Sequence, residues 1–251
     1  MRQIFPTAVD AIDPATAYAD MPTAAGRPGI RLNMIASVDG ATAIGGVSAP
    51  LTGPPDRVVY RLLRSLADVV LVAAGTARIE HYKPARVYDD YVGARRARGQ
   101  SDAPRIAVVS RSLALDWDLP LFREATERTI VITTADAPAE SLAAARSVCD
   151  VIAVGDGSVN LPAAMVALGE LGAAHVLSEG GPSLNGAMAE AGLIDELCLT
   201  ISPRLASGAA KRILAGPDLP APIELELCSL LEQDGFLLAR YRARTVIDER
   251  E

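Results

Sequence analysis

The sequence has few of the residues that build metal centres and disulfide frameworks. Its 251 residues include three cysteines, at positions 149, 198 and 228, and two histidines, His81 and His175. A structural zinc site usually takes four closely spaced Cys and His ligands, so we predict that the protein binds no metal. Scattered cysteines in odd number are typical of free thiols in a reducing compartment, and we therefore expect a cytoplasmic protein.

Membrane-spanning segments and the charge of a nucleic-acid binder are also missing. No run of 18 apolar residues occurs, and the N-terminal stretch lacks the apolar core of a signal peptide, so we expect no membrane partner. The net charge of −7 argues against binding to nucleic acid. The motifs G-x-S-x-G and G-x-x-x-x-G-K-[ST] are absent, which argues against an α/β-hydrolase and a P-loop nucleotidase.

Hydrophobic periodicity predicts an α/β fold with a mainly parallel sheet. Six short apolar runs alternate with helical patterns of about a dozen residues, as in βαβ units. The expected strands are 30–38, 68–74, 105–110, 129–133, 151–154 and 175–178, and the expected helices are 55–66, 138–148, 161–171 and 182–191. After residue 192 the runs 196–202, 225–232 and 236–244 have no long helix between them, so we expect the sheet to end in antiparallel strands. Residues 83–103 are expected to form a long polar loop.

The stretch 175–197, HVLSEGGPSLNGAMAEAGLIDEL, is the most informative part of the sequence. It predicts a strand, a turn at Gly180-Gly181 and a helix that begins at Pro182. Such a helix start presents unpaired N–H groups to an anion, and the glycines allow a ligand to approach the backbone. Glu179 immediately before the turn is unexpected at a site that holds only phosphate, and it suggests a second, non-phosphate ligand.

Three other strand ends carry residues that suit a ligand, and each has a simpler alternative. Asp39-Gly40 fits either a hairpin turn or an acid at the ligand-binding edge of the sheet. Gly75-Thr76 fits either a phosphate contact or a helix N-cap. Ser110-Arg111 fits either the 2′-phosphate of NADPH or a solvated loop. Together these strand ends suggest one long ligand, such as a dinucleotide, laid across the sheet edge, and hydride transfer as the chemistry.

Six segments, in order, resemble the pyrimidine reductase family of riboflavin biosynthesis, the C-terminal reductase domain of RibD. They are NMIASVDG (33–40), GGVSAPLTG (45–53), LRSLAD (63–68), AGT (74–76), SEGGPSL (178–184) and LIDELCLTISP (193–203). The resemblance implies a dihydrofolate-reductase-like fold, with a central sheet flanked by helices. It predicts one reductase domain over 30–245, followed by a tail over 246–251. Residues 1–29 are rich in Pro, Ala and Asp and show no sustained period, so we expect an irregular arm with about one helical turn there. The H-x-E and P-C-x-x-C motifs of the RibD deaminase half are absent, so we expect a stand-alone reductase.

The family resemblance also assigns residues to a site for NADPH and a small heterocyclic substrate. Asp39 and Glu179 are the expected catalytic residues and face the substrate, together with Asn33 and Arg86. Asn33 stands where bifunctional relatives usually have Lys, and Arg86 is the candidate to grip a substrate phosphate. The expected cofactor-binding residues are Ser48, Thr52, Gly75, Thr76, Ser110, Arg111, Gly180, Gly181, Pro182, Ser183 and Leu184.

We therefore expect an NADPH-dependent oxidoreductase that reduces 5-amino-6-(5-phosphoribosylamino)uracil by hydride transfer to C1 of the ribosylamine. One alternative is a dihydrofolate or pterin reductase on the same fold. Another is a non-catalytic NADP(H)-binding homologue. The apolar edges of the late strands, 197–202 and 236–244, together with the family resemblance, predict a homodimer.

Overall fold

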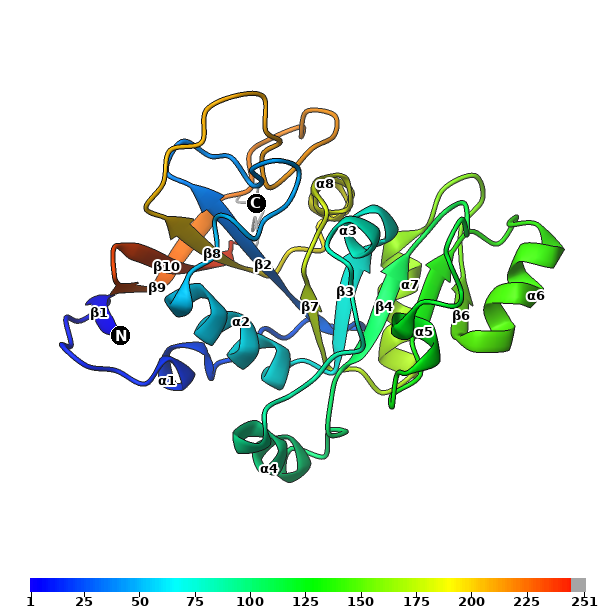
Figure 1. The fold of residues 1–251 in the computed structure, drawn as a ribbon, viewed down its shortest axis with the longest axis horizontal. Coiled ribbons are helices and arrows are strands. Elements are labelled where there is room, and N and C mark those ends of the chain that lie inside the picture. The colour runs from blue at the N-terminus through cyan, green and yellow to red at the C-terminus, as the bar shows by residue number, and fades with distance from the viewer. Residues whose placement is uncertain (245–251) are drawn as a thin grey trace, which may run out of the picture.

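One ten-stranded sheet with helices on both faces forms the centre of the molecule (Figure 1). The structure is a computed structural model and describes residues 1–244. The strands are β1 (Arg2–Phe5), β2 (Gly29–Ser37), β3 (Val69–Ala73), β4 (Arg105–Val109), β5 (Ile130–Thr133), β6 (Asp150–Ala153), β7 (His175–Ser178), β8 (Glu196–Ser202), β9 (Leu225–Gln233) and β10 (Phe236–Ala243). The helices are α1 (Pro14–Tyr18), α2 (Pro54–Leu66), α3 (Ala74–Ile79), α4 (Asp89–Ala97), α5 (Pro120–Arg123), α6 (Ala139–Val148), α7 (Leu161–Glu170) and α8 (Pro182–Glu190).

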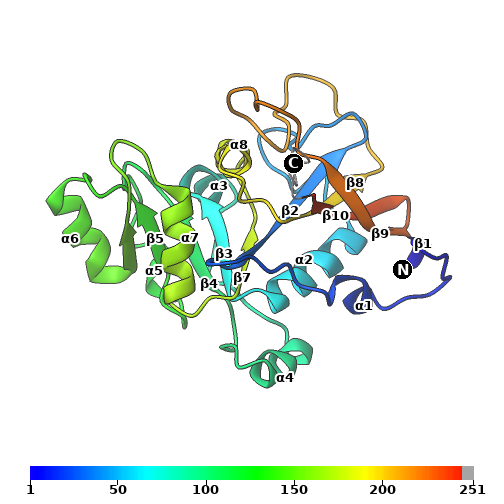
Figure 2. The same ribbon diagram turned by 180° about the vertical axis from the view of Figure 1, so that it is seen from behind.

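The central strands are apolar on both faces because helices cover both faces. On β3, Val70 and Val72 pack into a core with α2, α5 and α6, whereas Val69 and Leu71 pack into a second core with α7 and α8. This alternation follows from the two-residue period of a strand. Figure 2 shows α7 on the face opposite to that covered by α2 in Figure 1.

The strand order is β1-β9-β10-β8-β2-β7-β3-β4-β5-β6, and the seven strands from β8 to β6 run parallel. β10 pairs antiparallel with both β8 and β9, and β1 pairs antiparallel with β9. The predicted fold class, a mainly parallel sheet that ends in antiparallel strands, is confirmed. Because the seven parallel strands share one direction, their carboxyl ends meet at one sheet edge, which is where open α/β sheets bind ligands.

Local sequence patterns missed several elements. Residues 83–103 were expected to form a loop, but they contain helix α4. Charged residues are frequent in this helix, so its sequence shows little apolar periodicity. The short strand β1 lies in the segment expected to be irregular, whereas helix α1, of five residues, agrees with the one helical turn expected there. β8 was expected among the antiparallel strands, yet it pairs parallel with β2 and antiparallel only with β10. The predicted tail 246–251 lies outside the described residues.

Two general features concern residues 1–244. No helix there is long and apolar enough to cross a membrane. In the same part of the chain, no group of three or more His, Cys, Asp or Glu side chains is arranged to hold a metal ion.

Helix α4 fixes the end of α2 through a buried arginine. The Arg95 guanidinium donates hydrogen bonds to the backbone oxygens of Ser65 at 3.0 Å and Ala67 at 2.6 Å, and to that of Ser101 at 2.7 Å. Arg95 is fully buried, and burial lowers its pKa below the ordinary value. The carbonyls at the C-terminus of α2 have no partner within their own helix, so Arg95 satisfies them and holds α2 in place.

We predict that Arg95→Ala destabilises the protein by about 2–4 kcal/mol, because it leaves several buried carbonyls without a donor. Equilibrium urea unfolding measures this loss. Arg96→Ala is the matched control in the same helix, since the Arg96–Asp102 ion pair is solvent-exposed and its loss should change stability little. Equal unfolding midpoints for Arg95→Ala and Arg96→Ala would contradict the prediction.

Candidate active site

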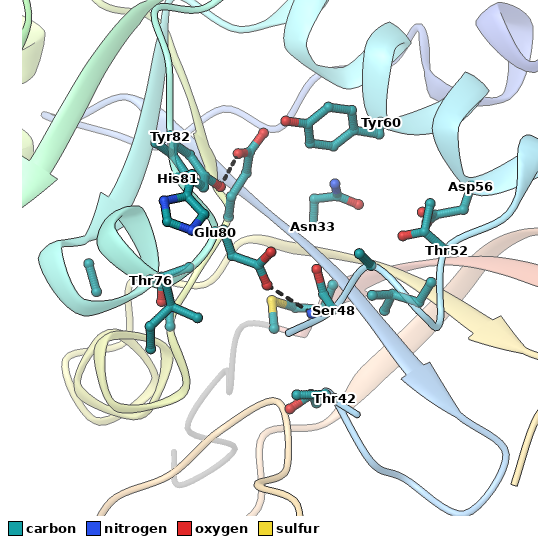
Figure 3. A pocket seen from close by; sticks show the side chains of 18 of the residues that line it. Asn33, Thr42, Ser48, Thr52, Asp56, Tyr60, Thr76, Glu80, His81 and Tyr82 are labelled. Atoms are coloured by element: carbon teal, nitrogen blue, oxygen red, sulfur yellow. Dashed lines mark hydrogen bonds between the residues drawn. The ribbon is translucent and has the colours of Figure 1, made fainter. Parts of the chain in front are cut away.

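A cleft of about 1740 Å³ lies at the carboxyl edge of the parallel strands. Its walls come from β2, the loop 42–52, one face of α2, the segment 73–89 and the turn between β7 and α8, with residues 206–211 at one end. Figure 3 shows side chains from several of these segments facing one another across the cleft. Three parts of the chain that are distant in sequence, residues 33–89, 179–184 and 206–211, therefore contribute to one site.

The cleft carries a positive charge balance in an acidic protein. Six Lys and Arg residues line it against four Asp and Glu residues, whereas the whole chain has a net charge of −7. A cleft that concentrates one sign of charge attracts ligands of the opposite sign. The arrangement therefore favours an anionic ligand. The basic residues are Arg57, Arg61, Arg64, Lys83, Arg86 and Lys211.

The Glu179 carboxylate is held by three hydrogen bonds. The Arg64 Nε and Nη2 atoms each donate to it at 2.7 Å, and the Tyr82 hydroxyl donates to its Oε2 at 2.5 Å. The side chains of Arg64 and Glu179 are 12% and 4% exposed. Burial opposes the charge on Arg64, but the Glu179 carboxylate outweighs it and raises the Arg64 pKa above its ordinary value. Glu179 thus joins α2, the segment after α3 and the end of β7.

The turn after Glu179 has a backbone geometry that requires glycine. The peptide between Gly180 and Gly181 is cis, Gly180 has a φ of +81°, and Gly181 is the N-cap of α8. The Gly181 N–H donates to the Thr76 Oγ1 at 3.2 Å, and a Cβ at Gly181 would lie 2.5 Å from that atom. Thr76 is inside α3 and does not cap it, so the N-cap alternative for Thr76 was wrong. Ser183 and Leu184 line the cleft, and as first-turn residues of α8 their N–H groups have no acceptor within their own helix.

Asp56 is a second acid in the cleft, in an environment unlike that of Glu179. It lies in the first turn of α2, and its burial raises its pKa. Hydrogen bonds from the hydroxyls of Thr200 and Thr52 and the charge of Arg57 offset only part of this effect. Figure 3 shows Asp56 beside Thr52. Asp56 therefore retains its proton to a higher pH than an ordinary aspartate does.

The loop 42–52 is anchored at both ends and crosses the cleft between them. The Thr42 Oγ1 donates to the Lys211 carbonyl oxygen at 2.8 Å, and the Ser202 hydroxyl donates to the Leu51 carbonyl oxygen at 2.7 Å. Between these anchors the Ser48 N–H donates to the Glu80 Oε1 at 2.8 Å (Figure 3). Glu80 thereby links this loop to the C-terminus of α3 on the other wall.

Most of the residues assigned by the family resemblance lie together in this cleft. Eleven of them line it: Asn33, Ser48, Thr52, Gly75, Thr76, Arg86, Glu179, Gly181, Pro182, Ser183 and Leu184. Gly180 is buried behind the turn. The cleft lining, as far as residues 1–244 define it, does not include Asp39, Ser110 or Arg111.

Asp39 lies in the turn after β2 and binds a neighbouring loop. Its carboxylate accepts hydrogen bonds from the Ser37 hydroxyl at 2.5 Å and from the N–H groups of Ala206 and Ser207 at 3.1 and 2.7 Å. The Ser37 hydroxyl first, and then these N–H groups, lower the pKa of Asp39 to about 2. Ala206 and Ser207 line the cleft, so Asp39 positions a segment of the wall.

Ser110 and Arg111 lie at the carboxyl end of β4, farther along the sheet edge. Ser110 is buried and Arg111 is exposed. The Arg111 carbonyl accepts a hydrogen bond from the Thr133 hydroxyl at 3.4 Å. The pKa of Asp136 is lowered mainly by Thr134 and the Gly157 N–H, and to a smaller extent by the charge of Arg111. The pair is therefore on the predicted edge but beyond the cleft.

Several cleft residues were not found from the sequence. Asp56, Tyr60 and Arg64 recur every four residues, so they form one stripe of α2 that faces the cleft. This polar stripe in an amphipathic helix was the available signal. Tyr82 and Glu80 had none, because their roles depend on partners from distant segments.

The chain is similar to known proteins in both sequence and fold. Residues 28–235 match the family model described as the RibD C-terminal domain. The chain is 27% identical over 190 residues to the 2,5-diamino-6-ribosylamino-4(3H)-pyrimidinone 5′-phosphate reductase of Methanothermobacter thermautotrophicus, covering 75% of this chain and 83% of that protein.

Two solved structures have similar folds. A pyrimidine reductase-like protein from Corynebacterium diphtheriae has a TM-score of 0.80 at 27% identity, over 87% of this chain and 92% of that one. The riboflavin biosynthesis reductase Rib7 of Saccharomyces cerevisiae has a TM-score of 0.71 at 15% identity, over 93% of this chain and all of that one. At that identity, the likeness to the yeast protein is one of fold alone.

We predict that Glu80→Ala frees the middle of the loop 42–52, because the Ser48 N–H loses its acceptor. Amide exchange around Ser48, followed by hydrogen–deuterium exchange mass spectrometry, should then quicken by about tenfold. Glu80→Gln keeps an acceptor oxygen and should retain most of the protection. Unchanged exchange in Glu80→Ala would show that the loop is held by other contacts.

Proposed function

The chain belongs to the RibD C-terminal domain family, and we propose that it is an NADPH-dependent reductase of 5-amino-6-(5-phosphoribosylamino)uracil. The observation that carries the proposal is the positively charged cleft in which eleven residues assigned by the family resemblance come together. The archaeal relative bears the name of a reductase of a phosphorylated ribosylaminopyrimidine, which supports the same substrate class.

The residues present fit a nicotinamide dinucleotide. Gly181 lines the cleft and lies so close to Thr76 that any larger residue there would clash, so the turn presents bare backbone to a ligand. Ser183 and Leu184 offer helix N-terminal N–H groups to a phosphate, and Gly75 presents open backbone near them. Ser48 and Thr52 supply hydroxyls on the opposite wall. When bound, NADPH would supply the hydride.

Ser110 and Arg111 are proposed to meet the far end of the cofactor. They lie on the same sheet edge beyond the cleft, and an exposed guanidinium suits a 2′-phosphate. Within the cleft, we assign Asn33 and Arg86 to the substrate, with Arg86 exposed at the rim where a phosphate would lie.

In this proposal the acidic residues Glu179, Asp39 and Asp56 have different roles. Glu179 is fully occupied by Arg64 and Tyr82, so it orients the turn at Gly180 and contributes negative charge next to the substrate. Asp39 acts through the loop at Ala206 and Ser207. Asp56 has the raised pKa that a general acid needs, and we assign it the proton that accompanies hydride transfer.

The same acid supports a second candidate. A buried, protonatable carboxyl group beside Thr200 also suits protonation of a pterin ring nitrogen, so dihydrofolate is the alternative substrate. The third candidate, a non-catalytic NADP(H)-binding protein, would have no use for an acid that is costly to bury. The homodimer and the domain bounds 30–245 also remain predictions.

NADPH oxidation by the purified protein tests the function. We expect turnover of the pyrimidine in a steady-state assay at 340 nm, about the absorbance maximum of the reduced nicotinamide that is consumed. If the protein turns over dihydrofolate and not the pyrimidine, its substrate is a pterin. Tight NADPH binding without turnover of either compound would favour the non-catalytic homologue.

We predict that Asp56→Asn lowers kcat by about a hundredfold or more, because the amide cannot donate the acidic proton. In the wild type, kcat/KM should be high below the raised pKa of Asp56 and fall tenfold per pH unit above it. The variant should lack this titration. Its thermal stability should equal or exceed that of the wild type, since ionised Asp56 is penalised by burial. A wild-type pH profile in the variant would exclude Asp56 as the acid.

A further inference from the structure

Two tyrosines contact the Arg64 guanidinium, but only one of their hydroxyls is used by the protein. The guanidinium carbon lies 4.5 Å from the ring centroid of Tyr60 and 5.6 Å from that of Tyr82. The Tyr82 hydroxyl donates to Glu179. The Tyr60 hydroxyl has no hydrogen-bond partner among residues 1–244, and it is not one of the side-chain atoms that are sealed from solvent without a partner. It therefore opens into the cleft that Tyr60 lines.

The Tyr60 ring is fixed in position. Arg64, which lies over its face, is itself held by two 2.7 Å hydrogen bonds to Glu179. Tyr60 also shares the polar stripe of α2 with Asp56, one helical turn before it. Figure 3 shows the Tyr60 hydroxyl pointing into the space above Asn33 and toward the wall that carries Tyr82. Because the ring is already fixed, its hydroxyl loses little conformational entropy when it binds a ligand.

The surroundings keep this hydroxyl protonated. Burial first, and then the negative charge of Glu179, raise the pKa of Tyr60 well above its ordinary value. The group is therefore a hydrogen-bond donor throughout the physiological pH range. A ligand that covers this hydroxyl without supplying an acceptor leaves it unpaired and loses affinity.

We infer that Tyr60 is a substrate-binding residue that selects heterocycles carrying an oxygen acceptor on the edge facing α2, such as a ring carbonyl. This inference rests on the proposed function and gives its substrate site a specific recognition group. It assigns to Tyr60 a role separate from that of Asp56, which holds a proton, and from that of Glu179, which holds the turn.

Tyr60→Phe tests the inference, because it removes the hydroxyl and keeps the ring under Arg64. With the pyrimidine or dihydrofolate, whichever is turned over, we expect KM to rise about tenfold while kcat changes less than about threefold. The Kd for NADPH and the thermal midpoint should stay unchanged. Tyr241→Phe on β10, outside the cleft lining, is the matched control and should leave KM unchanged.

Calorimetric titration of each compound into wild type and Tyr60→Phe separates the two possible failures. If the wild type binds a compound but does not turn it over, the proposed function is wrong. The affinities of wild type and Tyr60→Phe for that compound can still be compared. Equal affinity of wild type and variant for the bound compound would overturn the role of Tyr60. A wild type that binds neither compound would also overturn it.

Discussion

The ion pair between Arg64 and Glu179 is the interaction on which the cleft depends. The two residues are 115 positions apart, and their double hydrogen bond joins the last turn of α2 to the end of β7. Both side chains are largely removed from water, so loss of either partner would leave a poorly solvated charge, at a cost of about 3–5 kcal/mol. Because Glu179 directly precedes Gly180 and Gly181, the pair also sets where the turn and the start of α8 lie relative to α2. Tyr82 extends the link to the segment after α3.

This pair explains why two acids in one cleft have different properties. Glu179 accepts hydrogen bonds from a guanidinium and a phenol. Asp56 has hydroxyl partners and a more distant arginine, so burial prevails and raises its pKa. A pair of titratable groups in contrasting environments is the usual basis for separating an acid role from an electrostatic one. The raised pKa of Asp56 comes from its tertiary surroundings and not from the residue type, since an isolated aspartate titrates at a lower pH.

Local sequence patterns predicted the parts of the molecule that local physics determines. The parallel strands, the glycine turn at 180–181 and the helix start at Pro182 follow from apolar runs, backbone freedom and the fixed φ of proline. The family resemblance added eleven of the residues that line the cleft. Neither source revealed that Glu179 would be occupied by Arg64, or that Asp39 would bind the loop at Ala206 and Ser207, because such contacts join distant segments. Helix α4 was missed because its stability comes from Arg95 and the end of α2, not from an apolar stripe of its own.

The distribution of charge in the cleft reconciles two opposing requirements. A large anionic ligand needs cations, whereas an acid with a raised pKa needs a site that is poorly solvated and not crowded by positive charge. Five of the six basic residues lining the cleft are exposed side chains at its rim: Arg57, Arg61, Lys83, Arg86 and Lys211. The sixth, Arg64, is neutralised by Glu179. The half-buried interior is left to Asn33, Asp56 and Tyr60, which are polar but not cationic. Attraction therefore acts at the entrance, while the interior keeps the low polarity that lets one carboxyl group hold its proton.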